Sequence, residues 1–270
     1  MEKLAVEQFA SLAHPQRLAV FRLLMRRYPT RVPAGAIASA LGIKASTLSV
    51  YLGNLRSTGL ITQEREGTSL TYAADTTAAG HLVDYLVDDC CRGRGALCPP
   101  EMVQDQPLSV LFICTGNSAR SLIAETLVRD LGQGRFVAHS AGTTPRSAPS
   151  PLALAILERR GHDVSALRSK SLDHLLGAGS SRFDFVFTVC DAAANEDCPR
   201  WAGRPITAHW SEPDPVRVTG PLFERAEAFE STYQNLRNRI EAFVALPFET
   251  LDRMSLQAKV DELALLEEQK

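Results

Sequence analysis

The part of the sequence that most constrains the fold is a short segment near the middle of the chain, residues 110–121 (VLFICTGNSARS). It begins as an apolar strand, continues as a loop of small and polar residues, and ends where a helix can start. Cys114 ends the strand, and Arg120 and Ser121 stand at the mouth of the helix. The N–H groups of such a loop can turn inward around an anion, with the helix N-terminus behind them. The segment therefore predicts a strand–loop–helix unit that binds a tetrahedral oxyanion.

The residue types within this loop predict a nucleophile and an anion clamp. Arg120 carries a planar, always charged fork that suits an oxyanion. The positive potential should lower the pKa of Cys114 and make it a thiolate nucleophile, with a hydrogen bond from Ser121 to its sulfur. Asn117 is expected to fix the loop by bonding its backbone; the alternative is that Cys114 is only a buried apolar cysteine. We expect the oxyanion to be bound by Thr115, Gly116, Asn117, Ser118, Ala119, Arg120 and Ser121.

Strands and helices alternate along the second half of the chain. Strand-like stretches occur at residues 108–113, 136–140 and 183–189, with helical stretches from about residue 121, at 151–160, at 224–246 and at 251–266. This alternation predicts a parallel sheet flanked by helices, so we expect an α/β domain over residues 108–270. The preceding residues 99–107 (PPEMVQDQP) predict a linker.

The residues before the linker follow a different pattern. A helix that begins at Pro15 is followed by a short helix at 33–41 that Gly42 stops, and by a helix at about 45–57 that Ser46 can cap. Two helices joined by a tight glycine turn are typical of a helix-turn-helix. Residues 61–65 and 70–73 predict a β-hairpin, and a last helix runs from about residue 77 to Cys90. Residues 1–98 are therefore expected to form a winged helix-turn-helix domain, mainly α-helical with a β-hairpin.

The charge distribution indicates the partner of this first domain. The whole chain has a formal net charge of −2. Between Arg17 and Arg65, however, eight basic residues accompany a single acidic one, Glu64. A basic block within an acidic protein favours a polyanion as the partner of that block, so DNA is expected. The alternative is a helix-turn-helix used only for contacts with protein.

Composition excludes other classes of protein. Hydrophobic residues make up 45% of the chain, which is enough to build cores and excludes a mainly disordered protein. No apolar run approaches the length of a membrane-spanning helix, so no membrane partner is expected. The first residues lack the apolar stretch of a signal peptide, which favours a cytoplasmic location. In that compartment, six cysteines are more typical of metal binding or catalysis than of a disulfide framework.

Residues 108–270 resemble the thioredoxin-coupled arsenate reductases built on the low-molecular-weight tyrosine phosphatase fold. The resemblance is carried by residues 110–121, 140–143 (SAGT), 168–173 (RSKSLD), 188–191 (TVCD), 198–199 (CP), 209–210 (HW) and 214–215 (DP). It implies that the Cys114 thiolate attacks arsenate held by Arg120 and the loop, while Asp214 protonates the departing oxygen. Cys190 then attacks the adduct and releases arsenite, and Cys198 attacks Cys190. Thioredoxin reduces the Cys190–Cys198 disulfide, and no tightly bound cofactor is implied.

The loop alone does not separate arsenate reduction from hydrolysis of a phosphate ester, because both anions are tetrahedral. Cys190 and Cys198 permit thiol–disulfide exchange, which hydrolysis does not need. Asp214 and Pro215 are followed by residues 216–218 (VRV), where phosphatases of this fold usually carry aromatic residues that hold a phosphotyrosine ring. Reduction is therefore favoured. The alternatives are inert core cysteines, an Asp214 that only caps a turn, a phosphatase with a helix-turn-helix targeting module, and a non-catalytic oxyanion-sensing repressor.

Residues 1–98 resemble the ArsR/SmtB family of winged-helix repressors. The matching stretches are residues 13–18 (AHPQRL), 46–49 (STLS), 59–61 (GLI) and 65–67 (REG). The resemblance implies a homodimer that reads operator DNA with its recognition helix, about residues 45–57, in the major groove. Members often have histidine where this chain has Val50 and Tyr51, so a base preference does not carry over. The expected DNA contacts are Lys44, Ser46, Thr47, Ser49 and Tyr51, with Arg56 and Arg65 on phosphates.

Cys90, Cys91 and Cys98 form a further candidate site. Two adjacent cysteines at a helix end, with a third one seven residues later, can present three thiolates to one ion. Three soft sulfur ligands suit As(III), whereas tetrahedral zinc prefers a fourth ligand. The ArsR/SmtB resemblance includes arsenite sensors with a C-terminal cysteine cluster, and it implies As(III) as the regulatory ligand. The alternative is a set of incidental surface cysteines.

Overall fold

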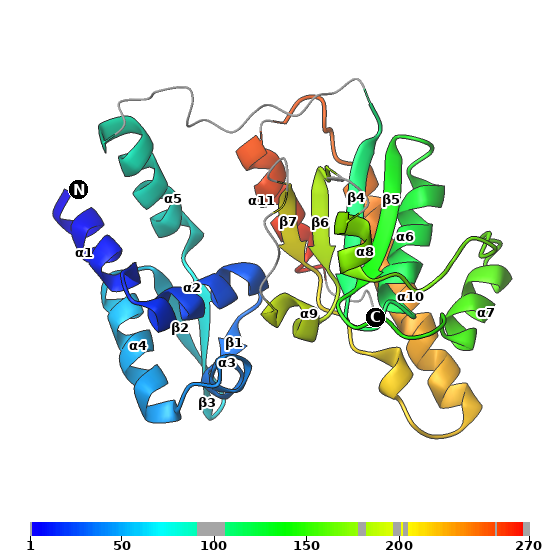
Figure 1. Ribbon diagram of the computed structural model, residues 1–270, viewed down its shortest axis with the longest axis horizontal. Coiled ribbons are helices and arrows are strands. Elements are labelled where there is room, and N and C mark those ends of the chain that lie inside the picture. Colours follow the sequence, from blue (N-terminus) through cyan, green and yellow to red (C-terminus); the bar gives the residue numbers. More distant parts are fainter. Residues whose placement is uncertain are drawn as a thin grey trace. The chain divides into compact units, whose positions relative to one another are not determined.

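The protein folds into two compact units. Figure 1 shows the computed structural model, which describes residues 2–90, 106–177, 182–196, 201, 205–251 and 253–266. The units are Met1–Pro100 and Glu101–Lys270, and each has a hydrophobic core of its own. Residues 99–105 of the expected linker and three of the expected site residues, Cys91, Cys98 and Cys198, lie outside the described residues.

The first unit is a winged helix-turn-helix, as predicted. Helices α3 (Ala34–Leu41) and α4 (Ala45–Ser57) meet at 112°, within the range of helix-turn-helix motifs. Gly42 makes the turn between them in the left-handed conformation (φ 62°). The predicted hairpin is formed by β2 (Ile61–Glu66) and β3 (Ser69–Ala74), which pair antiparallel. The remaining elements are α1 (Glu2–Leu12), α2 (Pro15–Arg27), β1 (Val32–Pro33), α5 (Thr76–Asp84) and a π-helical segment, η1 (Tyr85–Cys90).

Several details of this unit differ from the sequence expectations: helix α1 was not expected, and the predicted last helix continues from α5 as the π-helical segment η1. The prediction that Ser46 caps the recognition helix is wrong. The helix begins at Ala45, Lys44 occupies the N-cap position, and no side chain accepts a capping hydrogen bond there. The hairpin also gains a third strand, because β1 pairs with β3 in the register Val32↔Tyr72. A strand of two residues carries too little alternation for its sequence to predict it.

No single helix in the described part of the chain is long and apolar enough to cross a membrane. Helices α3 and α4 meet the criteria of length and composition only when they are counted together, across their 112° bend. Their apolar faces pack inside the first unit, where Ile37, Leu48 and Leu52 are buried.

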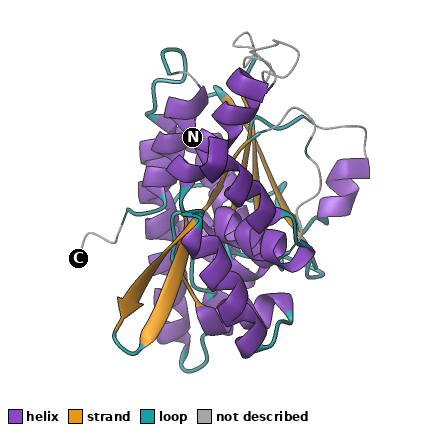
Figure 2. Ribbon diagram, turned by 90° about the vertical axis from the view of Figure 1, so that its left-hand side faces the viewer, coloured by secondary structure: helices purple, strands orange, loops and turns teal. Residues whose placement is uncertain are grey.

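The second unit is an α/β domain, as predicted. Its four strands are parallel, lie in the order β5-β4-β6-β7, and are flanked by helices (Figure 2). The strands are β4 (Leu108–Cys114), β5 (Phe136–Gly142), β6 (Phe185–Thr188) and β7 (Ile206–His209), of which β7 was not expected. The helices are α6 (Arg120–Leu131), α7 (Pro151–Arg159), α8 (Leu172–Gly177), α9 (Asp191–Asn195), a 3-10 turn η3 (Pro215–Arg217), α10 (Leu222–Val244) and α11 (Arg253–Leu263).

Parallel pairing brings the carboxyl ends of the strands to one edge of the sheet. Cys114 at the end of β4 pairs with Gly142 of β5, and Ile113 beside it pairs with Thr188 of β6. Thr188 in turn pairs with His209 of β7. The loops that follow these strands therefore leave from neighbouring points, which is where ligands bind in open α/β sheets.

Stacked aromatic rings form the centre of the second core. Phe187 of β6 lies with its ring centroid 4.2 Å from that of Trp210, and the two rings are stacked. Phe112 of β4 and Phe243 of α10 pack around both rings. All four side chains are fully buried. The sheet and helix α10 are therefore joined by these rings.

Replacing Phe187 by alanine removes the centre of this stack. We expect Phe187→Ala to lower the free energy of unfolding of the second unit by about 3–5 kcal/mol, because a large cavity is left behind. Urea unfolding followed by tryptophan fluorescence measures the change. Phe223→Ala is the matched control, since that ring is 68% exposed and its loss should change the free energy by less than about 0.5 kcal/mol. Equal effects of the two substitutions would contradict this account of the core.

Candidate functional site

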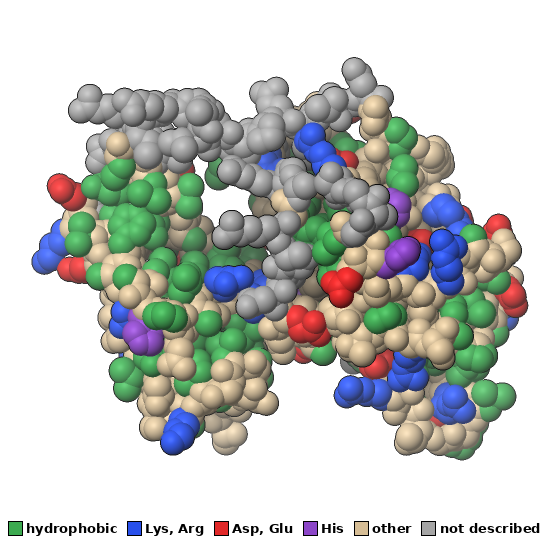
Figure 3. Space-filling view, in the orientation of Figure 1, with side chains coloured by type: hydrophobic (Ala, Val, Ile, Leu, Met, Phe, Trp, Pro, Cys, Tyr) green, Lys and Arg blue, Asp and Glu red, His purple; other side chains and the backbone are tan. Residues whose placement is uncertain are grey.

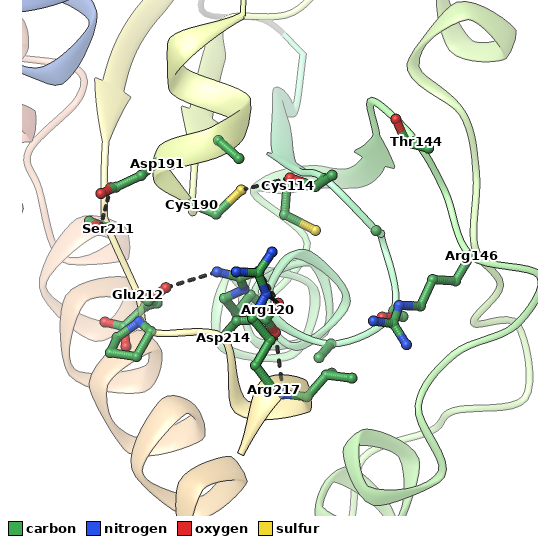
Figure 4. Close-up of a pocket in the computed structure, with 17 residues that line it drawn as sticks. Cys114, Arg120, Thr144, Arg146, Cys190, Asp191, Ser211, Glu212, Asp214 and Arg217 are labelled. Carbon is green, nitrogen blue, oxygen red and sulfur yellow. Dashed lines mark hydrogen bonds and ion pairs between the residues drawn. The ribbon is translucent and has the colours of Figure 1, made fainter. Parts of the chain in front are cut away.

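A pocket of about 670 Å³ opens at the carboxyl edge of the parallel sheet. Four chain segments line it: the loop after β4, the residues after β5, the start of α9 after β6, and the segment after β7 (Figure 4). Each segment follows a different strand, so the pocket exists only when the sheet is assembled. The lining residues are Cys114, Thr115, Gly116, Ser118, Ala119, Arg120, Thr144, Arg146, Cys190, Asp191, Ala192, Ser211, Glu212, Pro213, Asp214, Val216 and Arg217.

The Cys114 sulfur lies in a cradle of hydrogen-bond donors. The backbone N–H of Asn117 donates to Cys114 Sγ at 3.1 Å, and Ser121 Oγ lies 3.0 Å from the sulfur, as the sequence predicted. The cysteine is 2% exposed, yet it lines the pocket. The loop thus presents a buried sulfur to the pocket from one side and bonds it from the other.

Burial has the largest influence on the pKa of the Cys114 thiol. Loss of hydration raises this pKa above its ordinary value. The hydrogen bond from Ser121 and the charge of Arg120 lower this pKa, whereas the nearby Cys190 raises it. The expectation of a lowered pKa is therefore wrong, because it counted the positive groups of the loop and left out desolvation.

Asn117 holds the loop, by contacts different from those expected. Its backbone has a positive φ of 41°, a conformation that asparagine tolerates better than most residues. Its side-chain amide donates to Ser121 Oγ at 2.9 Å and to Ser140 Oγ at 2.8 Å, and its Oδ1 accepts from the N–H of Lys170 at 2.7 Å. The prediction that Asn117 bonds the backbone of its own loop is therefore corrected: it ties the loop to β5 and to the chain before α8.

Gly142 at the end of β5 allows the loop to approach the sheet. A Cβ atom at this position would lie 2.6 Å from the carbonyl oxygen of Thr115 and 3.1 Å from the backbone nitrogen of Asn117. Real Cβ atoms do not come this close to backbone, so any other residue would displace the loop. The Ser-Ala-Gly-Thr motif thus has a packing role beside the site.

Both terminal nitrogens of Arg120 are held by the segment that follows β7. Its Nη1 donates to the carbonyl oxygen of Glu212 at 2.9 Å, and its Nη2 lies 3.1 Å from Asp214 Oδ2 (Figure 4). Asp214 also accepts from the N–H of Val216 at 3.2 Å and so caps the turn η3. The alternative role of Asp214 as a turn cap is therefore confirmed, and the same carboxylate pairs with Arg120 in the pocket, while its expected role as a general acid stays a prediction.

Cys190 shares the pocket with Cys114. It follows β6, occupies the N-cap position of α9 and is 3% exposed, and Thr115 Oγ1 lies 3.5 Å from its sulfur. The structure thus brings together two cysteines that stand 76 positions apart, while Cys198 lies outside the described residues. The next residue, Asp191, is held by His209 Nε2 at 3.0 Å and by Ser211 Oγ at 2.6 Å.

Several lining residues were not predicted from the sequence. Thr144 and Arg146 come from the chain after β5, and the Arg146 side chain passes close to Gly116. Asp191 lies in the stretch 188–191 that carries the resemblance but was not predicted to line the site, and Glu212 stands between the predicted residues without a motif of its own. Among the described residues that line the pocket, none is aromatic. This composition agrees with the sequence VRV after Asp214 and leaves no ring to hold a phosphotyrosine.

The expected DNA-binding residues lie in and after α4. Lys44, Ser46, Ser49, Arg56 and Arg65 are exposed, and Thr47 and Tyr51 are half-buried. The Tyr51 hydroxyl donates to Gln16 Oε1 at 2.6 Å, so this side chain turns toward α2. Arg56 Nη1 donates to Gln63 Oε1 at 2.7 Å, which ties α4 to the hairpin. Of the seven expected contacts, Lys44, Ser46, Ser49, Arg56 and Arg65 are therefore accessible to a partner.

The protonation of Cys114 can be tested by alkylation. We expect the rate of alkylation of Cys114 by iodoacetamide to rise with pH around a midpoint above that of free cysteine, because only the thiolate reacts. Ser121→Ala should move the midpoint higher, because the hydrogen bond from Ser121 lowers the pKa of Cys114 and this variant removes that bond. Thr126→Ala, a buried hydroxyl elsewhere in α6, is the control that leaves it unchanged. Mass spectrometry measures the rates, and a midpoint below that of free cysteine would contradict the dominance of burial.

Each of the two units matches a known protein family. Residues 109–258 match the low molecular weight phosphotyrosine protein phosphatase family, and residues 12–64 match a helix-turn-helix domain family. The glutaredoxin arsenate reductase of Synechocystis sp. is 28% identical over 50% of this chain and 95% of its own length. The arsenate reductase of Shouchella clausii is 30% identical over 50% of this chain and 93% of its own length.

Solved structures are also similar. The thioredoxin-dependent arsenate reductase of Corynebacterium glutamicum is 22% identical, with a TM-score of 0.37, over 77% of this chain and 94% of that one. The family matches cover the loop with Cys114 and Arg120 in one unit and α3 and α4 in the other. The chain thus belongs to the low molecular weight phosphotyrosine protein phosphatase family and carries a helix-turn-helix domain before that family's domain.

Proposed function

We propose that residues 108–270 reduce arsenate to arsenite, and that residues 1–98, joined to them by the linker 99–107, form an arsenite-responsive repressor. The observation that carries the first part is the pocket lined by both Cys114 and Cys190. Hydrolysis of a phosphate ester needs one nucleophilic cysteine, whereas reduction of arsenate needs a second thiol to supply electrons. The names of the related arsenate reductases support the same reading.

The first step in this proposal forms a covalent adduct. Arsenate binds against the loop amides and Arg120, and the Cys114 thiolate attacks the arsenic atom. One As–O bond breaks, and Asp214, which in this proposal leaves its ion pair with Arg120 and takes up a proton as the anion binds, gives that proton to the departing oxygen, which leaves as water. Burial raises the pKa of the Cys114 thiol, so the thiol must lose its proton before the attack, and the hydrogen bonds from Asn117 N–H and Ser121 Oγ stabilise the thiolate that forms.

The second step transfers two electrons. The Cys190 thiolate attacks the Cys114 sulfur, the S–As bond breaks, and its electron pair reduces As(V) to As(III), which leaves as arsenite. A Cys114–Cys190 disulfide remains. Cys198 attacks Cys190 and releases the Cys114 thiolate, so that the oxidised chain holds a Cys190–Cys198 disulfide. The two thiols of thioredoxin supply the electrons that reduce this disulfide and close the cycle.

A phosphatase is the second candidate, because the family is named for that activity. Against it stands the lining of the pocket, in which no described residue has a ring that stacks on phosphotyrosine. Turnover of an aryl phosphate that is unaffected by Cys190→Ser would favour the phosphatase. Sustained arsenate reduction with thioredoxin, its reductase and NADPH would favour the reductase.

The relay predicts a distinct defect for each cysteine. Cys114→Ser should abolish arsenate reduction, because a serine hydroxyl at neutral pH is a far weaker nucleophile than a thiolate. Cys198→Ser should allow one turnover with thioredoxin and stop at the Cys114–Cys190 disulfide. Cys90→Ser, in the other unit, is the control that keeps full activity. NADPH consumption and the amount of arsenite formed per protein measure these outcomes.

Two results would contradict the relay. Sustained turnover of Cys198→Ser with thioredoxin alone would exclude a role for that cysteine. Turnover of the wild type with glutaredoxin and glutathione, but not with thioredoxin, would leave the arsenate reductase assignment in place and replace the proposed reductant.

The proposal for the first unit rests on its exposed surfaces. The first turns of α4 present Lys44, Ser46 and Ser49 to solvent, as entry into a major groove requires. Hydrophobic side chains gather over α1 and α5 on the face that Figure 3 shows. Leu4 of α1 and Val83 of α5 are exposed. We propose that this apolar surface forms a homodimer that reads two operator half-sites. The proposed As(III) ligands are Cys90, Cys91 and Cys98, of which only Cys90 lies among the described residues.

The two proposed activities predict a linked response. Arsenite should release operator DNA from the wild type and from Cys114→Ser alike, because it binds the sensor cysteines directly. Arsenate with reductant should release DNA only when Cys114 is intact. Fluorescence anisotropy with a labelled operator fragment measures the release. Replacing Cys90 and Cys91 by serine should keep the reductase and abolish release, so release of that variant by arsenite would refute the sensor site.

A further inference from the structure

Glu212 is an acidic side chain buried beside an anion-binding pocket, where the chemistry has no use for a negative charge. The residue is 3% exposed, and its side chain is 1% exposed. It stands between Ser211 and Pro213 in the segment that follows β7, and it lines the pocket. Burial of a carboxylate is costly unless other groups compensate it, so its surroundings indicate why it is there.

Two residues of α10 hold the Glu212 carboxylate. Arg239 Nη1 forms an ion pair with Glu212 Oε1, and the Arg239 side chain is itself only 12% exposed. Asn235, one helical turn earlier, donates to Glu212 Oε2 at 3.3 Å. The segment after β7 is thereby fastened to α10, a helix of 23 residues that packs against α6.

The backbone of the same residue holds Arg120. The carbonyl oxygen of Glu212 accepts from Arg120 Nη1 at 2.9 Å, as Figure 4 shows. This bond occupies one end of the guanidinium and fixes the rotation of its plane. The other end, Nη2, stays on the side of Asp214 and the pocket. The bidentate geometry of arginine is of use to an oxyanion only when that plane is set.

We propose that the Glu212–Arg239 ion pair is a positioning device that aims Arg120 at the oxyanion. Glu212 touches no substrate in this proposal and acts through its carbonyl on Arg120. Its carboxylate is needed because a backbone carbonyl in a connecting segment holds its place only if the segment is anchored. The inference rests on the proposed oxyanion site, and it does not depend on whether the bound anion is reduced.

The ion pair has a clear alternative role as a clamp that only stabilises the fold. Removing one partner of a buried pair destabilises a protein because it leaves an uncompensated charge. Removing Glu212 should cost more stability because Arg239 has few other partners: its Nε has no hydrogen-bond partner among the described residues. A readout of anion binding, separate from stability, therefore decides between positioning and clamping.

Binding of inorganic phosphate to the full-length reduced protein gives that readout, measured by isothermal titration calorimetry. Glu212→Gln keeps the shape of the side chain and loses its charge, and we expect it to weaken phosphate binding about tenfold or more, because a small misplacement of a clamp costs up to about 100-fold. The control is Glu241→Gln, which breaks the exposed ion pair with Arg237 on the same helix. Its phosphate affinity should equal that of the wild type. Thermal unfolding checks that each variant is folded at the titration temperature.

A double-mutant cycle tests whether Glu212 acts through Arg120. Arg120→Lys should weaken phosphate binding by itself, and adding Glu212→Gln to it should change the affinity by less than about twofold, since coupled residues are not additive. In the wild-type background, the same change should raise the KM for arsenate and leave kcat much less affected. Arg239→Lys keeps the positive charge without the fork, and provides a milder variant with the same direction of change if Glu212→Gln unfolds.

Each result has a defined meaning. Unchanged phosphate affinity in folded Glu212→Gln or Arg239→Lys would overturn the positioning role and leave the oxyanion site intact. Equal weakening by Glu212→Gln with and without Arg120→Lys would also overturn it. A wild-type protein that binds no phosphate would overturn the oxyanion site itself, and arsenate turnover measured alongside shows separately whether the proposed reductase survives.

Discussion

The loop after β4 keeps its form because the amide of Asn117 reaches three different parts of the domain. Its bonds to Ser121, Ser140 and the N–H of Lys170 join the helix start, strand β5 and the chain before α8. Lys170 in turn bonds both carboxylate oxygens of Glu125 in α6, at 2.8 and 3.0 Å. Because these groups are largely shielded from water, each bond is strong and its loss is expensive. The position of the Cys114 sulfur is thus set by the fold around the loop as well as by the loop itself.

The segment after β7 is a second constraint on the site, because it contacts residues next to each of the two cysteines. Ser211 bonds Asp191 beside Cys190, while Glu212 and Asp214 hold Arg120 near Cys114. A shift of this segment would therefore disturb both Arg120, which lies near Cys114, and Asp191, which follows Cys190. The aromatic stack of Phe187 and Trp210 lies under the same segment and fixes where it begins. Core packing and site geometry are for this reason hard to separate by mutation.

The sequence predicted what depends on short spacing along the chain. Cys114, Arg120 and Ser121 share one strand–loop–helix unit, so their proximity follows from local geometry, and the same holds for α3 and α4. The sequence alone could not predict contacts between segments that are far apart along the chain. Thr144, Arg146 and Glu212 line the pocket only because the sheet order is β5-β4-β6-β7. The pKa of Cys114 was predicted in the wrong direction because burial is a property of the assembled core. Strand β7 was missed because its sequence, ITAH, lacks the continuous apolar run that marks β6, a strand of the same length.

Because Arg120 forms an ion pair with Asp214, an anion that enters the pocket must compete with this carboxylate for the arginine. An arginine without a competing carboxylate would bind tetrahedral anions tightly and release them slowly. With the carboxylate in place, binding is an exchange of one negative partner for another, so its net free energy is smaller than the strength of the contact suggests. In the proposed reaction, an uncharged product would form no ion pair with Arg120, so the Asp214 carboxylate would be free to pair with this arginine again when the product leaves.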